Sequence, residues 1–387
     1  MATTPAAISP FRSASRVLLE VWNEDAVIAM ARNLRKEAGG ASIAFVFCSP
    51  DWRAHTPDLL EILQVEGHAR QIVGCSALGL AGTAQEDDGV SGCSVLFINA
   101  PGAGIKTWFI DENFQLPPHN PDATTGWILL GNPLRLNAMD LLNDMNRVYP
   151  NTPVYGGMAS GGWEPDKMFL LHEAKDARQS PGILIQLTGL QLSGIVSQGC
   201  QPIGEAFTVT KVHEDLVLSV GGRPAYDVLR DAVESLTLAE RSRAAGNIMA
   251  GLAVTEYRDE FTRGDFLIRN ILGGDQETGA LRLGGLPRVG QTIQFQLREK
   301  DSADADLRMR CTETWEDGIR PSAALLFTCG GRGQHLFGIP NHDAGLIADT
   351  FGPIPLAGFY ANGEFGPVCG INAIHGYTAS ILMMGPL

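Results

Sequence analysis

The segment Gln71-Ile-Val-Gly-Cys-Ser-Ala-Leu-Gly79 joins a short apolar run to a turn bounded by two glycines. Such a run is typical of a buried strand, and a tight turn directly after it often needs a positive φ, which glycine adopts without strain. The turn also leaves backbone N–H groups exposed to anything bound there. Upstream, we expect a helix over residues 24–37, a buried strand over 42–48 and a second helix over 56–65.

The order strand, polar turn, helix, strand and glycine-rich turn appears twice more along the chain. The strand, helix and second strand with its turn lie at 126–130, 137–147 and 153–162 in the second copy, and at 323–327, 343–350 and 355–364 in the third. Each copy is followed by a further apolar strand, at 93–98, 183–187 and 378–383. This pattern predicts an α/β (mixed α+β) fold in which helices flank mixed β-sheets built from repeated units. Chance similarity among α/β segments is the alternative.

The pattern changes between the second and third copies. Helices are expected over 224–236 and 238–248, and strands over 266–271, 280–283 and 292–297. The last strand alternates between apolar and polar residues, which predicts an antiparallel sheet with one solvated face. Residues 300–306 are acidic and predict a solvated loop or the start of a helix. We therefore divide the chain into an N-terminal tail (1–22), an N-terminal domain (23–221) and a C-terminal domain (222–387).

The composition excludes several classes of protein. Acidic residues outnumber basic ones by 43 to 29, and a net charge of −14 is unsuited to binding nucleic acid. The seven cysteines form no C-x-x-C pair, which indicates reduced thiols in the cytoplasm. No apolar run approaches the ~18 residues of a membrane helix. The first 17 residues contain two arginines and no acid, so a targeting segment stays open beside a disordered tail.

Signatures of common enzyme classes are missing from the sequence. There is no P-loop, no G-x-G-x-x-G that opens a helix and no histidine pair at zinc spacing. The turn at 74–79 is not a nucleophile elbow, because Leu78 stands where that motif requires glycine. We therefore assign neither catalytic nor metal-binding residues. Enzymatic activity stays uncertain, and a binding protein is the preferred interpretation.

Candidate ligand-binding residues lie in and around the glycine-rich turns. Cys329-Gly-Gly-Arg-Gly333 follows a buried strand and combines backbone amides with an arginine, whose planar fork suits a carboxylate. Arg332 is thus the candidate for a ligand carboxylate, unless it pairs with an internal acid such as Glu364. The candidate set is Gly74, Cys75, Ser76, Gly156, Cys329, Gly331, Arg332, Gly333, Asn362, Glu364 and His375.

Three of these candidates have alternative roles. Glu364 either pairs with a ligand amine or caps a turn. Cys329 is a reactive thiol if Arg332 lowers its pKa, and otherwise a small buried hydrophobic residue. His375 is either a structural histidine or a ligand or base.

These strings resemble the FIST family. Gly74-Cys-Ser-Ala-Leu-Gly79 resembles the GCS-x-x-G string of the FIST N-terminal domain. The strings that resemble the FIST C-terminal domain are Gly273-Gly-Asp-Gln-Glu-Thr-Gly279, Arg288-Val-Gly-Gln-Thr-Ile-Gln-Phe-Gln-Leu-Arg298, Phe327-Thr-Cys-Gly-Gly-Arg-Gly333, Pro355-Leu-Ala-Gly-Phe359, Gly363-Glu-Phe-Gly-Pro367 and His375-Gly-Tyr-Thr-Ala-Ser380. Together they cover roughly residues 40–385. The family usually has a polar residue where Gly330 stands, so no side-chain contact is carried over there.

The resemblance implies a sensory protein that binds a small ligand, such as an amino acid or another small carboxylate. The two FIST halves nearly fill the chain, so we expect a stand-alone cytoplasmic receptor that signals through a separate partner. Neither nucleic-acid binding nor membrane insertion is expected. Some relatives are haem-based nitric oxide sensors and others carry an F-box. The alternatives are therefore a haem sensor with His335, His342 or His375 as ligand, and a scaffold subunit. A thiol enzyme that uses Cys329 is a further alternative.

Overall fold

The computed structural model describes residues 11–118, 124–162, 164–174, 176–256, 258 and 260–387. Each of the three repeated units contains a pair of parallel strands. The pairs are β2 (Ile43–Cys48) with β3 (Ile72–Ser76), β8 (Thr124–Gly131) with β9 (Val154–Met158), and β21 (Ala323–Cys329) with β22 (Leu356–Ala361). A later strand pairs antiparallel with the first strand of each pair: β6 (Cys93–Asn99), β11 (Gly182–Thr188) and β25 (Thr378–Gly385). The predicted repeat is confirmed.

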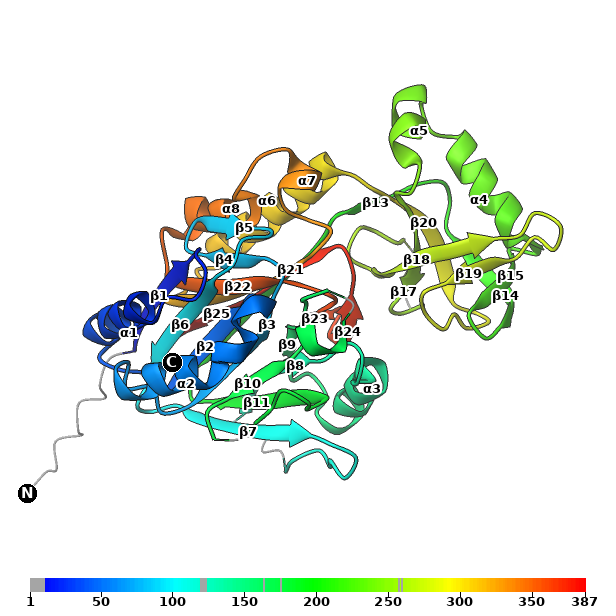
Figure 1. Ribbon diagram of the computed structural model, residues 1–387. Coiled ribbons are helices and arrows are strands. Elements are labelled where there is room, and N and C mark those ends of the chain that lie inside the picture. Colours follow the sequence, from blue (N-terminus) through cyan, green and yellow to red (C-terminus); the bar gives the residue numbers. More distant parts are fainter. Residues whose placement is uncertain (1–10, 119–123, 163, 175, 257, 259) are drawn as a thin grey trace, which may run out of the picture.

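Helices cover the outer face of each sheet. The first sheet carries α1 (Glu24–Ala38) and α2 (Thr56–Val65), the second α3 (Ala138–Val148), and the third α6 (Lys300–Glu316) and α8 (His342–Phe351) (Figure 1). The short helices are η1 (Pro50–His55), η2 (Pro165–Lys167) and α7 (Gln334–Phe337). The inner faces of the three sheets pack against one another in one core. We call this three-unit body, residues 11–198 and 300–387, the ring.

Each unit of the ring completes the sheet of a neighbouring unit. Beyond the parallel pairs, β4 (Leu80–Gly82) and β5 (Gln85–Asp87) extend the third sheet, β10 (Leu170–His172) the first, and β23 (Glu364–Val368) and β24 (Ile371–His375) the second. At the opposite edges, β7 (Gly104–Ile110) pairs with β11, and β12 (Gln191–Gln198) pairs with β25. The units are therefore interlocked by exchanged strands.

One expectation for the N-terminus differs from the structure. Residues 12–18, assigned to the tail, form strand β1 (Arg12–Leu18), which pairs along its whole length with β6. Backbone hydrogen bonds to β6 order this segment although its side chains are mostly small or polar. The expectations for residues 1–10, including a targeting segment, lie outside the described residues.

Glycine at one equivalent position of each unit allows the parallel strands to approach closely. A Cβ atom at Gly74, Gly156 or Gly358 would lie 1.7, 1.9 or 2.1 Å from a carbonyl oxygen of the preceding parallel strand. Real Cβ atoms essentially never come so close, so each unit needs glycine here. Gly74 was expected to begin a turn, but it lies inside β3, as Gly156 lies inside β9 and Gly358 inside β22, so these glycines serve strand packing.

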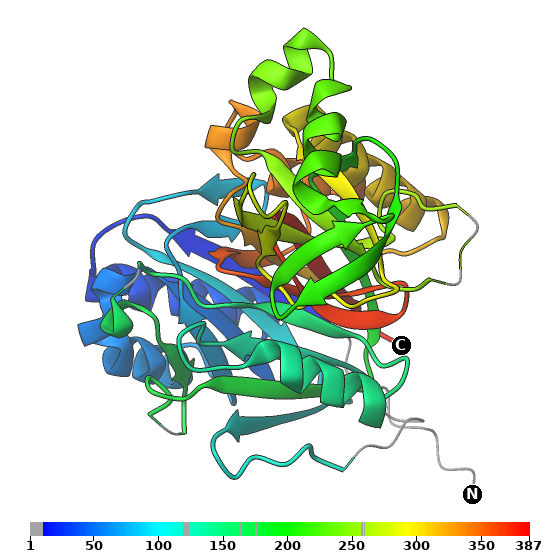
Figure 2. The same ribbon diagram turned by 90° about the vertical axis from the view of Figure 1, so that its right-hand side faces the viewer.

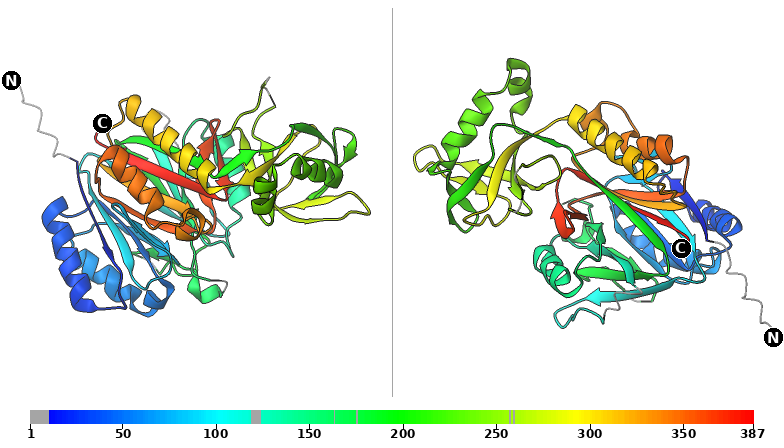
Figure 3. Two further views of the ribbon diagram at one scale, coloured as in Figure 1. Left: turned by 90° about the horizontal axis from the view of Figure 1, so that it is seen from above. Right: turned by 180° about the vertical axis from the view of Figure 1, so that it is seen from behind.

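The described residues of the range 200–298 form a separate barrel, which lies between the second and third units in the sequence. Its strands pair in the closed order β20 (Thr292–Arg298), β14 (Phe207–His213), β15 (Leu216–Val220), β19 (Leu281–Leu283), β18 (Phe266–Gly274) and β17 (Ile248–Ala253), which returns to β20. Two short strands, β13 (Cys200–Pro202) and β16 (Arg223–Pro224), and two helices, α4 (Ala225–Glu234) and α5 (Leu238–Ala244), complete it. It projects to one side of the ring (Figure 3) and faces the viewer in Figure 2. Residue 222 lies within the barrel.

The solvated face expected for 292–297 is a second difference. Five of its six residues are buried, because β20 lies inside the sheet and pairs with β13, β14 and β17. The helix expected over 238–248 ends at Ala244, because β17 begins at Ile248. Among the described helices, none has both the length and the apolar character that crossing a lipid bilayer requires.

Candidate functional site

The glycine-rich turns of the three units meet at the carboxyl ends of the parallel strands. Ser160 N donates to Ser76 O at 3.1 Å. Ser160 Oγ accepts from Leu78 N at 2.9 Å and donates to Tyr360 O at 2.5 Å. The third turn joins the second, since Asn362 N donates to the Met158 carbonyl at 3.1 Å. The three turns therefore form one hydrogen-bonded surface.

A cavity of about 850 Å³ opens between this surface and the barrel. The ring contributes residues from all three units: Leu78, Pro133, Leu136–Met139, Met158, Cys329–Gly331, Ala361–Gly363 and Ile374–Tyr377. The barrel contributes residues 268–270 of β18 and Gly284. Open α/β sheets bind ligands at the carboxyl ends of their strands, and small-molecule sites typically measure ~300–1,000 Å³. We call this hollow the ring–barrel cavity.

Four of the sequence-predicted residues line the ring–barrel cavity: Cys329, Gly331, Asn362 and His375. Four others lie in the interior of the ring, at Gly74, Cys75, Ser76 and Gly156. Ser76 Oγ accepts from Phe169 N at 3.0 Å and so helps to connect β3 to β10. Gly333 lies away from the cavity, beside the Tyr360 hydroxyl. Arg332 and Glu364 are fully buried behind the cavity wall.

Arg332 is paired with an internal acid. Its Nε and Nη2 donate to the two carboxylate oxygens of Asp343 at 2.7 and 2.9 Å, and Thr328 Oγ1 donates to the same carboxylate at 2.8 Å. Burial favours a raised pKa for Asp343, but the charge and hydrogen bonds of Arg332 outweigh it and hold the pKa well below its usual range. Arg332 is also fully buried and does not line the cavity, so the carboxylate role of Arg332 stays a prediction.

Glu364 and Cys329 both have raised pKa values. Burial raises the pKa of Glu364 well above its usual range, and its Oε2 accepts from Thr378 N at 3.3 Å. Burial, together with the nearby Glu364 carboxyl, raises the pKa of Cys329 to about 12. Cys329 therefore presents a thiol rather than the thiolate that acts as a nucleophile. The role of Glu364 toward a ligand amine stays a prediction.

The three histidines considered as haem ligands differ in their surroundings. His342 has Asp343 and Asp304 within 2.9 Å of its two ring nitrogens, and His335 is exposed beside Asp88. His375 lines the cavity, and burial lowers its pKa to about 4. Its Nε2 donates to Gly366 O at 2.9 Å, and the free Nδ1 is buried. As arranged, none of them presents a nitrogen to a haem iron in the cavity, so these residues do not fit that cofactor.

Arg269, which the sequence reasoning missed, is the charged residue in the described lining of the cavity. It lies on β18, and its Nη1 donates to the carbonyl oxygens of Ile268 and Ile374 at 3.0 and 3.1 Å. No carboxylate in the described part of the chain pairs with it. Burial lowers the pKa of Arg269, but an arginine stays protonated near neutral pH. The signal in the sequence that could have identified Arg269 is its position as a charged residue inside the apolar run 266–271.

Tyr377 was also missed, although it lies beside His375 in the sequence. Its φ of 60° is left-handed, which is uncommon for a bulky residue and is concentrated at functional sites. Its hydroxyl donates to Asn270 Oδ1 at 2.8 Å, and its ring lies 4.6 Å from the Arg298 guanidinium. Tyr377 therefore connects the ring to the barrel across the cavity.

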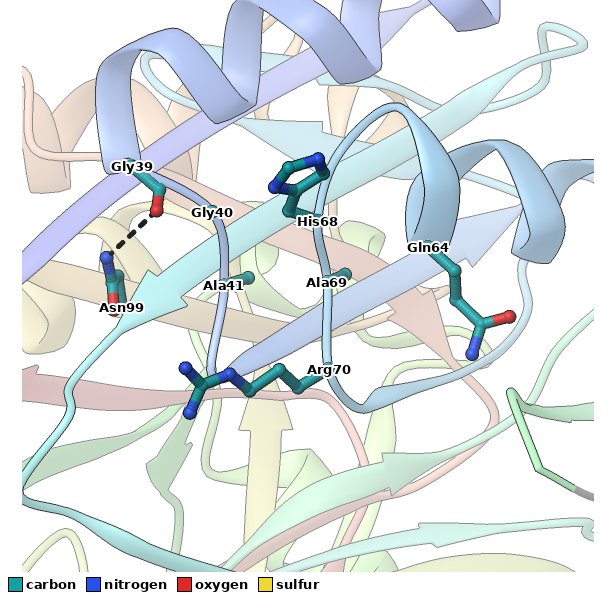
Figure 4. A pocket seen from close by; sticks show the side chains of 8 residues that line it. All are labelled: Gly39, Gly40, Ala41, Gln64, His68, Ala69, Arg70 and Asn99. Carbon is teal, nitrogen blue, oxygen red and sulfur yellow. Dashed lines mark hydrogen bonds between the residues drawn. The ribbon is translucent and has the colours of Figure 1, made fainter.

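A second polar hollow, of about 340 Å³, lies on the first unit (Figure 4). It is formed by the loops that follow α1 and α2, where Asn99 Nδ2 donates to Gly39 O at 3.3 Å. These loops precede β2 and β3, so the hollow is at the amino ends of the strands. The helix ends there point carbonyl groups outward, unlike the amides of a helix N-terminus. We therefore place the candidate site in the ring–barrel cavity.

The fold and the cavity define a class: a mixed α/β protein of interlocked repeated units with a small-molecule-sized cavity at the carboxyl ends of its parallel strands. No group of three or more potential metal ligands gathers anywhere in the described residues. The FIST N domain model matches residues 42–223, and the FIST C domain model matches residues 225–367. The chain therefore belongs to the FIST family. FIST domains are generally associated with small-ligand sensing in signal transduction.

Two mycobacterial relatives illustrate how far the similarity extends. The uncharacterized protein Rv0628c of Mycobacterium tuberculosis H37Rv is 35% identical over 364 residues, which cover 91% of this chain and 94% of the relative. The uncharacterized protein Mb0898c of Mycobacterium bovis is 40% identical over 261 residues, which cover 66% of each chain. The first similarity spans both FIST domains.

Proposed function

We propose that this FIST protein is a cytoplasmic sensor that binds a small carboxylate, such as an amino acid, in the ring–barrel cavity and signals through a separate partner. Arg269 is the observation that carries the proposal. A cation that lines a cavity and has no described carboxylate partner favours an anionic ligand. All seven cysteines are free thiols, as a protein of a reducing compartment requires.

Other groups in the lining complement a small carboxylate. The first turn of α3 contributes Ala138 and Met139 to the cavity, and the amino end of a helix favours negative charge. Asn362 Nδ2 donates to Ala159 O at 3.2 Å, while its Oδ1 has no partner in the described structure and is free to accept from a ligand amine. A ligand between Arg269 and Asn362 would touch both barrel and ring. Binding would thereby favour one position of the barrel relative to the ring, and a signalling partner would detect that position.

A binding screen with a matched pair of variants tests this proposal. The full chain is titrated calorimetrically with free amino acids and with short carboxylates such as acetate and succinate, with thermal shift as a second readout. We expect at least one ligand to raise the melting temperature, and Arg269→Gln to weaken its binding about 10–100-fold, since a hydrogen bond to a charged group contributes ~1.5–3 kcal/mol.

The control is Arg282→Gln, which removes a surface arginine that lies 3.3 Å from Asp215 on the barrel and outside the cavity. It should leave the affinity unchanged. The proposal is wrong if no ligand in the panel binds, or if the two variants bind a ligand equally well.

A further inference from the structure

Another hollow, of about 510 Å³ and distinct from the one on the first unit, adjoins the ring–barrel cavity. It runs between α3 and β24 of the ring and strands β17 and β18 of the barrel, and β24 packs against both α3 and β18 (Figure 1). The two hollows share Met139, Arg269 and Ile374. Arg269 therefore lies on the wall of both hollows.

The lining of this 510 Å³ hollow is mainly apolar. Its larger apolar side chains are Met139, Leu142, Leu252, Val254, Leu267, Leu286, Ile371 and Ile374, and we call the hollow that they line the apolar groove. Leu286 on the barrel is 65% exposed and Ile371 on the ring is 44% exposed. Apolar side chains exposed on both walls of one groove are typical of a binding surface.

We propose that the natural ligand is a carboxylate with an apolar tail, whose head binds at Arg269 and whose tail lies in the apolar groove. The inference rests on the proposed function and narrows its ligand class. Charge supports this occupant over a cationic amphiphile. The groove lining carries Arg269 and Arg288 against one acid, Asp140, which already accepts from Asn137 Nδ2 at 2.6 Å. The volume of the apolar groove, about 510 Å³, also suits a ligand larger than a single amino acid.

The test is a series of carboxylates of increasing chain length. The full chain is titrated calorimetrically with acetate, hexanoate and decanoate below their micelle concentrations, and with decylamine, which carries the decanoate tail on a cationic head. Each CH₂ group that the groove buries should raise the affinity about four-fold. We therefore expect decanoate to bind far more tightly than hexanoate, acetate or decylamine.

Two rim variants test where the tail lies. Leu286→Asp and Ile371→Asp change exposed side chains and should leave the fold intact, but they should remove most of the gain from hexanoate to decanoate. Leu238→Asp is the matched control, because Leu238 on α5 is 85% exposed and lies outside both hollows. Arg269→Gln should weaken all the carboxylates by a similar factor.

The outcomes separate this inference from the proposed function. If acetate or an amino acid binds as tightly as decanoate, the tail does not occupy the groove and the inference is overturned, while the proposed function stands. Decylamine binding as tightly as decanoate, or an equal loss in Leu238→Asp, also overturns it. If no carboxylate or amino acid binds, the proposed function fails, and this inference with it.

Discussion

Two arginines with the same chemistry have different roles in this protein. Arg332 lies in the Gly-Gly-Arg-Gly sequence that predicts an anion site, yet Asp343 neutralises it inside the ring. Arg269 lies on β18, a strand in which the sequence predicted no site residue, yet it lines the ring–barrel cavity without a described carboxylate partner. The sequence predicts that the turns contribute to a site, because glycine and polar residues gather there. It does not show which arginine is already paired, since that depends on the packing of distant segments.

The Arg332–Asp343 pair should make a large contribution to stability. Arg332→Met leaves the Asp343 charge buried and unpaired, so we expect the free energy of unfolding to fall by about 3–5 kcal/mol in urea denaturation. Arg282→Met, which breaks the surface pair with Asp215, should cost less than ~1 kcal/mol. Because the pKa of Asp343 is lowered in the folded state, the stabilisation is present above the ordinary aspartate pKa of about 3.9 and is lost as the pH falls below it. Equal losses in the two variants would contradict this account.

Glu86 should give the opposite pH dependence. Burial and the charge of Asp343 raise the pKa of Glu86 to about 8, and its Oε2 accepts from Asp343 N at 3.0 Å. The folded chain therefore retains a proton that the unfolded chain releases above about pH 4.5. Stability should fall as the pH rises from about 5 to 8, by on the order of 3 kcal/mol. Urea denaturation across this range should show a flatter dependence for Glu86→Gln, and an identical dependence would count against the raised pKa.

At the scale of elements, helices with a clear apolar face were predicted closely. The helix expected over 56–65 is α2 (Thr56–Val65), and that over 24–37 is α1, one residue longer. The 17-residue helix α6 was anticipated only at its first turn. Its buried face includes Asp306, which accepts from Gln198 N at 2.9 Å. Because this acidic residue lies among Ala303, Leu307 and Cys311, the sequence shows no clear apolar periodicity for the helix. Such a buried polar contact cannot be inferred without the strand that it meets.

The glycines at the parallel strands allow a direct test of strand packing. A Cβ at Gly358 would lie 2.1 Å from Leu326 O, so Gly358→Ala must separate β21 from β22 and should cost about 3 kcal/mol or more. Gly345→Ala is the control, because a Cβ at this position in α8 meets nothing within 4 Å. It should stabilise the protein by roughly 0.5–1 kcal/mol. Chemical denaturation of both variants measures the contrast, and a neutral Gly358→Ala would refute the close approach.

At the scale of the whole molecule, the sequence predicted three similar units but not how they interlock. The strand β4 follows β3 in the sequence and pairs with β22, more than 270 residues away. Which strand edges pair depends on how the three units pack together, and a local sequence pattern contains no information about that packing. Closure of the barrel was missed for the same reason, since β17 and β20 look like ordinary strands until they pair.

Strand exchange predicts that the N-terminal half does not fold alone. A fragment of residues 1–221 would lack β22 and β25, with which β4 and β12 pair, and half of the barrel. We expect such a fragment to show no cooperative unfolding transition by circular dichroism. Co-expression with residues 222–387 should restore a complex that elutes at the size of the full chain. A cooperative transition of the isolated fragment would show that the shared core is not required.

The central claim is that the ring–barrel cavity binds a small carboxylate through Arg269. Calorimetric titration of the full chain, Arg269→Gln and Arg282→Gln with the panel of amino acids and carboxylates tests it most directly. The account predicts saturable binding of at least one carboxylate to the full chain and to Arg282→Gln, and binding weakened about 10–100-fold in Arg269→Gln. Binding of equal strength in all three proteins, or in none of them, would contradict it.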